Sequence, residues 1–294
     1  MRAEVVFSSS VDEIRATQVG RAAIGLTVAS WLRSLTRPCT DAALSLLFPA
    51  DCRICREPLL QASRLPVCQE CRDSIAPIQG NLCSICGERI VTFSRAEAEP
   101  EPCGMCRRSA PAFSRAVAYG AFEDALREMI HLLKYDRVLP AAGFLSEKLS
   151  AAMVQLPAPT DGWLVVPVPL HTSKLRQRGF NQAEVIARGA LKRHSKLLNT
   201  KCLVRQRETV SQAGLTRHQR RENIRGAFAV RDANAVRGRA ILLVDDVFTT
   251  GTTIAECARV LLRAGASSVS AATVARALKA DRLNLSTVGV DKAA

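Results

Sequence analysis

Four Cys-x-x-Cys pairs constrain the first third of the chain more than any other feature. They hold eight of the eleven cysteines, and they are Cys52/Cys55, Cys68/Cys71, Cys83/Cys86 and Cys103/Cys106. The segment around them is rich in turn formers and has few large apolar residues, so it cannot order itself by burying a core. We therefore expect bound metal to cross-link this segment.

The spacing of the pairs predicts the kind of metal site. Two residues between cysteines allow one tight turn to aim both sulfurs at one ion, and two such turns complete a tetrahedral site of four thiolates. Intervals of 12 residues between the first and second pairs and 16 between the third and fourth are typical of zinc ribbons. We expect two structural zinc ions, one for each consecutive quartet. An interleaved pairing, an iron–sulfur cluster and redox thiols are the alternatives.

The length and composition indicate an ordinary globular protein. At roughly 150 residues per domain, 294 residues predict about two domains. No apolar run reaches the roughly 20 residues that cross a bilayer, and acidic residues precede the short apolar stretch 22–29, which disfavours a signal peptide. We expect a cytoplasmic protein without membrane insertion, in which the cysteines stay reduced.

After the cysteine segment, strand-like and helix-like apolar patterns alternate. The expected strands are 116–122, 163–168, 226–230, 240–244 and 269–274, and the expected helices are 123–133, 144–153, 181–192 and 253–264. This order predicts an α/β domain with a mainly parallel sheet flanked by helices. The polar, basic stretch 201–225 has no sustained period and is expected to be a long loop or hairpin.

The resulting division has four parts. Residues 1–40 are an extension of little information, 41–110 form the cysteine module, 111–280 form the α/β domain, and 281–294 form a loose tail. A short apolar helix over 42–48 is expected at the start of the module. Cys257 falls on the apolar face of an expected helix and is assigned to the core.

The stretch Ile241 to Thr253 carries the main candidate site. Four large apolar residues, typical of a buried central strand, are followed by Asp245 and Asp246 and then by Val247, Phe248 and Thr-Thr-Gly-Thr-Thr. Ligands of open α/β sheets bind beyond the carboxyl ends of the strands, and the N-terminus of the following helix favours phosphate. We expect Val247, Thr249, Thr250, Gly251, Thr252 and Thr253 to bind a sugar phosphate. The two carboxylates are placed to bind sugar hydroxyls or, through water, Mg²⁺.

Other interpretations of this stretch are weaker. Two aspartates that only cap a helix leave the five-residue Thr-Gly run unexplained. A P-loop requires Gly-Lys and a dinucleotide-binding fold requires Gly-x-Gly, and the chain contains neither.

Most of the net charge of +14 lies in one quarter of the chain. Residues 171–240 contain 17 Lys or Arg against four Asp or Glu. Such a surface attracts anions, either phosphorylated small molecules or nucleic acid. The alternative is a basic but functionally neutral surface.

Several motifs together resemble a known family. They are the double cysteine module, Leu133-Lys134-Tyr135, Val166-Pro167-Val168-Pro169, Arg178-Gly179-Phe180-Asn181-Gln182-Ala183, the Arg205-x-Arg207-x-Thr209 run, and Ile241 to Thr253. The last stretch resembles the phosphoribosyl pyrophosphate signature of type I phosphoribosyltransferases. From about Asp41 to Leu278 the chain resembles the ComF-like competence proteins.

The resemblance implies roles for individual residues. Asp245 and Asp246 would bind the ribose hydroxyls, and Thr249 to Thr253 would hold the 5′-phosphate. Arg205, Arg207 and the basic stretch that follows would match a mobile loop that closes over pyrophosphate and Mg²⁺. A long charged segment between strands is also where lids are found.

Two functions of different class are consistent with these features. The first is an enzyme that transfers phosphoribose to a nitrogen acceptor such as a nucleobase. The second is a non-catalytic accessory protein of DNA uptake that binds single-stranded DNA or senses phosphoribosyl pyrophosphate. Aromatic residues are only 4% of the chain, which offers few stacking platforms for bases. The sequence identifies neither the acceptor nor the oligomeric state.

Overall fold

The computed structural model describes residues 50–59, 63–90, 101–209 and 217–278. The chain divides into two compact units, of which the first is 1–50 with 58–62 and the second is 51–57 with 63–294. All elements below belong to the second unit. The expected helix over 42–48, the extension 1–40 and the tail 281–294 lie outside the described residues.

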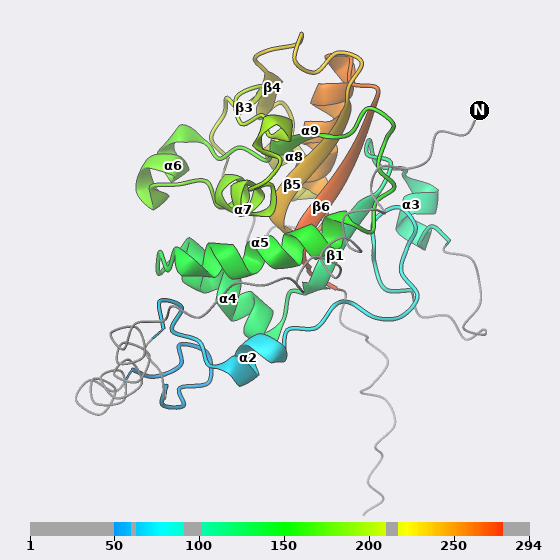
Figure 1. The fold of residues 1–294 in the computed structure, drawn as a ribbon. Helices are drawn as coiled ribbons and strands as arrows, with labels where there is room; N and C mark the ends of the chain where they lie inside the picture. Colours follow the sequence, from blue (N-terminus) through cyan, green and yellow to red (C-terminus); the bar gives the residue numbers. More distant parts are fainter. Residues whose placement is uncertain (1–49, 60–62, 91–100, 210–216, 279–294) are drawn as a thin grey trace, which may run out of the picture. The chain divides into compact units, whose positions relative to one another are not determined.

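A parallel four-stranded sheet forms the centre of the α/β part, in the order β1-β6-β5-β2 (Figure 1). Its strands are β1 (Ala116–Ala121), β2 (Leu164–Pro167), β5 (Ala240–Phe248) and β6 (Ser268–Arg276). Strand β5 lies between β2 and β6, with Leu164 opposite Ile241 and Ser268 opposite Ala240. The predicted parallel sheet is therefore confirmed.

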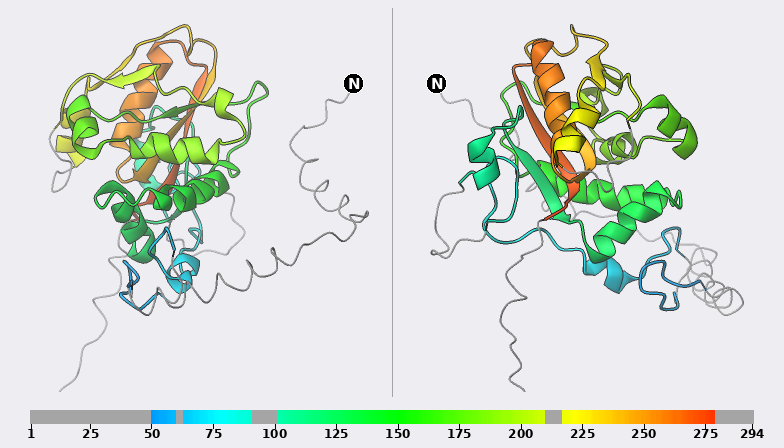
Figure 2. Two further views of the ribbon diagram at one scale, coloured as in Figure 1. Left: turned by 60° about the vertical axis from the view of Figure 1, so that its left-hand side comes forward. Right: turned by 180° about the vertical axis from the view of Figure 1, so that it is seen from behind.

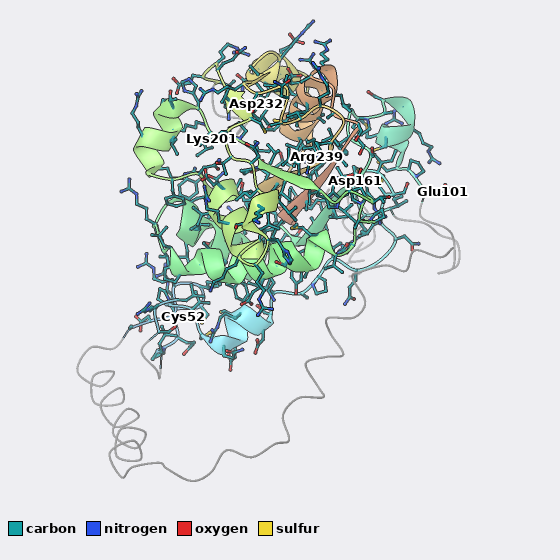
Figure 3. All side chains as sticks on the ribbon, turned by 45° about the horizontal axis from the view of Figure 1, so that its top comes forward. Cys52, Glu101, Asp161, Lys201, Asp232 and Arg239 are labelled. Carbon is teal, nitrogen blue, oxygen red and sulfur yellow. The ribbon has the colours of Figure 1, made fainter. Side chains whose placement is uncertain are left out.

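Helices cover both faces of this sheet (Figures 1 and 2). One face carries α4 (Asp124–Lys134), α5 (Pro140–Met153) and α7 (Gln182–Ala190), and the other carries α9 (Thr252–Arg263). Side chains fill the space between the layers (Figure 3). Residues 241–244 are completely buried because β5 is central and covered on both faces.

The shorter elements lie at the margins of the sheet. Helices α2 (Gln69–Asp73) and α3 (Gly104–Arg108) belong to the cysteine module, and α6 (Thr172–Arg178) and the 3₁₀ turn η1 (Ser195–Leu197) follow β2 and α7. Strands β3 (Leu203–Arg205) and β4 (Phe228–Val230) pair antiparallel, and α8 (Arg217–Ile224) lies between them in sequence.

The prediction of a loop or hairpin over 201–225 was wrong in one respect, because this stretch contains α8. The helix has no apolar period that would announce it, and of its described side chains only Ile224 is buried. Its C-terminal carbonyls, which helices leave without a partner, accept hydrogen bonds from the Arg207 guanidinium at 2.8 Å. A hydrogen-bond donor from outside the helix thus stabilises the end of α8, whose own sequence does not predict a helix.

Two element boundaries also differ from the prediction. Strand β5 continues to Phe248 instead of ending at Val244, because β6 pairs with it as far as Arg276. Helix α5 begins at Pro140, where the proline ring fits the first helical turn, instead of at Phe144. Among the described residues, no helix has the length and apolar character needed to span a membrane.

Candidate functional site

The two aspartates of β5 point to opposite faces of the sheet. Ile241 and Leu243 belong to the apolar cluster that includes α9, and side chains alternate along a strand, so Asp245 faces α9. Asp246 faces the layer of α4 and α7, where its side chain contacts Lys134 and Gln182. The sheet therefore separates the environments of two adjacent carboxylates.

Asp246 is buried and held by two long-range contacts. Its carboxylate forms an ion pair with Nζ of Lys134 at the end of α4, and Nε2 of Gln182 donates to its Oδ1 at 3.3 Å. Although burial opposes the charge, the Lys134 ammonium lowers the pKa of Asp246. Asp246 is therefore the ionised member of the pair.

Asp245 is in the opposite electrostatic situation. Burial and the negative charge of Asp246 raise the pKa of Asp245 well above its usual range. The Asp246 amide donates to Oδ1 of Asp245 at 2.9 Å. Asp245 and Cys257 both act electrostatically on the Arg205 guanidinium, whose pKa is lowered by burial. The two adjacent carboxyl groups thus have pKa values shifted in opposite directions, and the ionised Asp246 can accept hydrogen bonds.

The loop after β5 turns sharply into α9. Gly251 has φ +72°, a left-handed conformation, and a Cβ at this position would collide with the Phe248 ring. Thr250 and Thr252 place their hydroxyl oxygens 2.8 Å apart, and α9 begins at Thr252. The loop therefore presents hydroxyls and helix N-terminal amides together, which is the chemistry of an anion site.

Other cations lie around the two carboxylates, with Arg205 near Asp245 and Cys257 and Arg178 donating to Oε1 of Gln182. Lys174 and Arg178 come from α6, and Arg205 ends β3. Burial and the positive charges of Arg205 and Arg178 lower the pKa of Lys174, and Glu208 is the acid that opposes this effect. Arg205 lies over the Phe228 ring at 5.5 Å and donates to Oγ1 of Thr209. These cations repel one another, so a bound anion would stabilise the cluster.

The sequence did not identify four residues of this neighbourhood. Lys134, Gln182 and Arg178 lie within motifs that carried the family resemblance, yet nothing in those motifs connected them to Asp246 or to Arg205. Lys174 had no signal beyond its basic surroundings. The guanidinium of Arg207, by contrast, bonds to the end of α8, so its expected contact with pyrophosphate stays a prediction.

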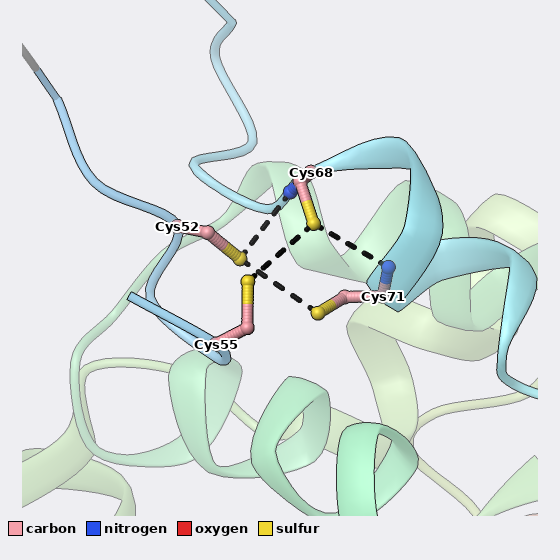
Figure 4. A group of neighbouring side chains, drawn as sticks. All are labelled: Cys52, Cys55, Cys68 and Cys71. Carbon is pink, nitrogen blue, oxygen red and sulfur yellow. Dashed lines mark hydrogen bonds between the residues drawn. The ribbon is translucent and has the colours of Figure 1, made fainter. Parts of the chain in front are cut away.

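The first cysteine quartet forms a compact cluster (Figure 4). The sulfurs of Cys52, Cys55, Cys68 and Cys71 lie within 4.8 Å of one another. Cys55 and Cys68 are separated by 3.7 Å and Cys52 and Cys71 by 3.9 Å between sulfurs. Tetrahedral thiolates about 2.3 Å from zinc are about 3.8 Å apart, whereas a disulfide requires about 2.05 Å. These separations fit a four-thiolate zinc site.

Backbone amides support this arrangement of sulfurs. The Cys68 amide donates to the sulfur of Cys52 at 3.4 Å, and the Cys71 amide donates to that of Cys68 at 3.4 Å. Burial opposes ionisation of Cys52, but the amide donors of Cys68 and Cys55 lower its pKa to about 6. Donors of this kind stabilise the thiolate that a metal needs.

The second quartet repeats the geometry. Sulfurs of Cys83, Cys86, Cys103 and Cys106 lie within 4.8 Å of one another, with Cys86 and Cys103 at 3.8 Å. The Cys103 amide donates to the sulfur of Cys83 at 3.1 Å. Both quartets join consecutive pairs, so the interleaved alternative is wrong. Of the remaining cysteines, Cys257 and Cys202 are buried in the apolar cluster, which confirms the core assignment of Cys257, and Cys39 lies outside the described residues.

Comparisons with known proteins agree with the two kinds of site. Residues 43–107 match the double zinc ribbon domain and residues 185–287 match the phosphoribosyl transferase domain. These matches, with the parallel sheet and its flanking helices, confirm the predicted fold class. Together with the sulfur geometry, they support structural zinc in both quartets.

Relatives match across most of the chain. The DNA utilization protein YhgH of Escherichia coli O157:H7 is 32% identical over 236 residues, which cover 79% of this chain and 100% of that protein. Competence protein F of Haemophilus influenzae is 29% identical over 225 residues, covering 71% and 96% of the two chains. Competence protein ComFC of Bacillus subtilis is 27% identical over 219 residues, covering 71% and 84%.

Proposed function

We infer that this chain, which belongs to the family of DNA utilization protein YhgH and competence protein F, binds phosphoribosyl pyrophosphate with magnesium. We further propose that it transfers phosphoribose to a nitrogen acceptor of the nucleobase type. The observation that carries the proposal is the pairing of Asp245 and Asp246 with the Thr249 to Thr253 loop at one end of β5. Ribose hydroxyls and a phosphate are the groups that such a combination recognises.

The ribose would lie against the two carboxyl groups. Ionised Asp246 would accept a hydrogen bond from one hydroxyl, and Asp245 would bind another. A charge-assisted hydrogen bond is about twice as strong as a neutral one, so Asp246 is expected to contribute more to affinity. The 5′-phosphate would bind at the start of α9, where the Thr250 and Thr252 hydroxyls add to the helix dipole.

The pyrophosphate group would bind the cluster of Lys174, Arg178 and Arg205. Glu208 acts on Lys174 and Arg205, and Asp245 also acts on Arg205, and a polyanion would relieve the mutual repulsion of the cations. During transfer, the acceptor nitrogen would form a bond to the anomeric carbon and lose its proton to solvent, while the bond to pyrophosphate breaks and its electron pair leaves with the pyrophosphate. The cations would stabilise that developing charge, and magnesium would neutralise part of it.

The binding half of this proposal is tested by calorimetry with phosphoribosyl pyrophosphate and Mg²⁺. Asp246→Asn should weaken binding about tenfold or more, because a hydrogen bond to a charged group contributes about 1.5–3 kcal/mol. Asp161→Asn is the matched control, since Asp161 is exposed (Figure 3). Equal affinity of the Asp246→Asn variant and the wild type would overturn the proposed site.

The transfer half has a separate assay. The wild type is incubated with donor, Mg²⁺ and a panel of nucleobases, and pyrophosphate release is measured. Release that depends on one base supports transfer and identifies the acceptor. If the protein binds the donor but releases no pyrophosphate with any base, the transfer proposal is contradicted, and a sensor or scaffold function is supported.

A specific observation favours the second candidate, an accessory protein that binds single-stranded DNA. Tyr135 at the end of α4 is 67% exposed, and the Arg178 guanidinium lies 5.8 Å from its ring. Arg137 nearby donates to the Gln177 carbonyl at 2.8 Å, which joins this edge to α6. An exposed aromatic ring among arginines is a stacking platform for a base.

Binding of single-stranded DNA across salt concentrations tests this candidate. Affinity should fall steeply with salt, and Tyr135→Ala should weaken it by about tenfold, as loss of one stacked base would. Val154→Ala is the control, because Val154 is also a strongly exposed apolar side chain. Equal loss in both variants, or no salt dependence, would count against a DNA site at this edge.

A further inference from the structure

Arg276, the last residue of β6, joins the second cysteine quartet to the sheet. Its side chain is buried, with a salt bridge from Nη2 to Glu88 at 3.0 Å. Nη1 donates to the Cys86 carbonyl, and Nη2 lies 3.6 Å from the Cys86 sulfur. Glu88 and Cys86 both belong to the turn that carries the second ribbon's ligands. One guanidinium therefore contacts a ligand sulfur, a ligand carbonyl and an acid of the same turn.

On its other side, the Arg276 guanidinium contacts the ring of Phe248. This ring in turn contacts the loop from Thr249 to Thr253, which we call the phosphate loop. The guanidinium carbon lies 4.4 Å from the Phe248 ring centroid, and the two residues are register partners on β6 and β5. The ring packs edge-on against Phe113 at 5.9 Å. It also occupies the space that a Cβ on Gly251 would need. The Phe248 ring therefore packs directly against the turn at Gly251.

A cleft of about 410 Å³ runs beside this contact. Its walls include Cys86 and Cys106 of the second quartet, Arg276, and Thr250 and Thr252 of the phosphate loop. Metal ligands and the phosphate loop therefore face one space, and Arg276 with Phe248 lies between them.

We propose that Arg276 is a positioning residue through which the second zinc ribbon fixes the phosphate loop. That the Thr249 to Thr253 loop binds a ligand rests on the proposed function. A guanidinium is planar, so bonds made in its plane to Cys86 and Glu88 also fix the face that stacks on Phe248. Groups that bond to metal ligands hold those ligands in place, and the constraint acts in both directions. Without the metal, the turn at Cys86 would no longer be held in place. Arg276 would then lose its fixed partners in that turn, and the Phe248 ring that packs against Gly251 would become more mobile.

The energetics argue that orientation, and not stability, is what Arg276 provides. Burying a guanidinium is costly even when it is paired, and a well-packed apolar side chain often replaces a buried ion pair at no loss. In addition, Nε of Arg276 is buried without a hydrogen-bond partner. An apolar residue would fill this space but would not bind both the ribbon turn and the ring.

Hydrogen exchange of the zinc-loaded full chain tests the coupling without any ligand. Arg276→Gln should speed amide exchange of Thr249 to Thr253 at least about tenfold, while exchange in residues 241–244 stays as in the wild type. Arg276→Lys keeps the charge but not the planar fork, so its loop should exchange at an intermediate rate. Arg107→Gln is the control, since Arg107 is exposed on the same ribbon and pairs with Glu101 at 3.4 Å.

Unchanged loop exchange in Arg276→Gln would overturn the proposal, as would acceleration spread equally through the core strands. If Arg276→Gln does not fold, Arg276→Lys decides by the same comparison. A second readout uses the cobalt-substituted protein, in which thiolate-to-cobalt absorption reports the contact to Cys86. This absorption should shift in both Arg276 variants and not in Arg107→Gln, and identical spectra would contradict the contact.

Calorimetry with phosphoribosyl pyrophosphate then separates this inference from the proposed function. Weaker binding by zinc-loaded Arg276→Gln, by about tenfold, supports the coupling. If the wild type does not bind phosphoribosyl pyrophosphate, the proposed function is contradicted. Amide exchange of the loop would still test whether Arg276 couples the ribbon to it. Wild-type affinity in Arg276→Gln together with unchanged exchange would remove only the coupling.

Discussion

Replacement of Lys134 by methionine removes the positive charge from Asp246 and keeps the length of the side chain. The side chains of Lys134 and Asp246 are only 16% and 5% exposed. Breaking a buried ion pair by removing one partner costs about 3–5 kcal/mol, because the other charge is left buried and unpaired. We therefore expect Lys134→Met to be strongly destabilised at neutral pH.

Proton binding sets an upper limit on this cost. From an ordinary pKa near 3.9, neutralising an aspartate costs about 4 kcal/mol at pH 7 and about 1.5 kcal/mol at pH 5. The uncompensated charge thus costs at most about 4 kcal/mol at pH 7 and about 1.5 kcal/mol at pH 5, so the loss of stability should be about 2.5 kcal/mol smaller at pH 5 than at pH 7. In the wild type the pKa of Asp246 is lowered. Its stabilising contribution is therefore complete at both pH values and is lost only as the pH falls through that lowered pKa.

Scanning calorimetry of the zinc-loaded protein measures this effect. At roughly 2–4 °C per kcal/mol for a domain of this size, a loss of about 3–5 kcal/mol should lower Tm by about 6–20 °C at pH 7, and the fall at pH 5 should be smaller by at least about 5 °C. Lys192→Met, at an exposed position, should change little. The double variant Lys134→Met/Asp246→Asn should recover most of the loss. A Tm within about 2 °C of wild type at pH 7, or no recovery in the double variant, would contradict a stabilising ion pair between Lys134 and Asp246.

Three further predictions concern the loop, the second ribbon and α8. Gly251→Ala should weaken calorimetric binding of phosphoribosyl pyrophosphate at least tenfold, because φ is positive there and the Phe248 ring fills the Cβ position; wild-type affinity would contradict this. Cys106→Ser should lower the zinc content by one ion per chain in elemental analysis, and retention of both ions would contradict the quartet. Arg207→Gln should speed amide exchange in α8, whose terminal carbonyls lose their donor; unchanged rates would show that α8 does not depend on this contact.

Features encoded within one contiguous stretch were predictable from the sequence. The buried run 241–244 and the helix that follows it were both located correctly, because a central strand and the turn after it depend on neighbouring residues. The two acids Asp245 and Asp246 predicted that the strand ends before them. In the structure β5 continues to Phe248, because it pairs with β6 that far.

Helix α8 illustrates a second limit. Its residues have no apolar period, and its end is supported by Arg207, which lies outside the helix. Propensity and periodicity describe a segment in isolation, so they do not detect a helix that depends on a distant donor.

The sequence alone located the cysteine pairs, the central sheet strands with the helices between them, and the Asp-Asp and Thr-Gly elements of the site, but not α6, α8 or β3. Each of the features it located depends on local spacing along the chain. The fold was needed to show that consecutive cysteine pairs share a site and that Lys134 forms an ion pair with Asp246. It also brought Arg276 to Glu88, 188 residues away. These contacts depend on which helix covers which face of the sheet, and that choice is made by packing of the whole core.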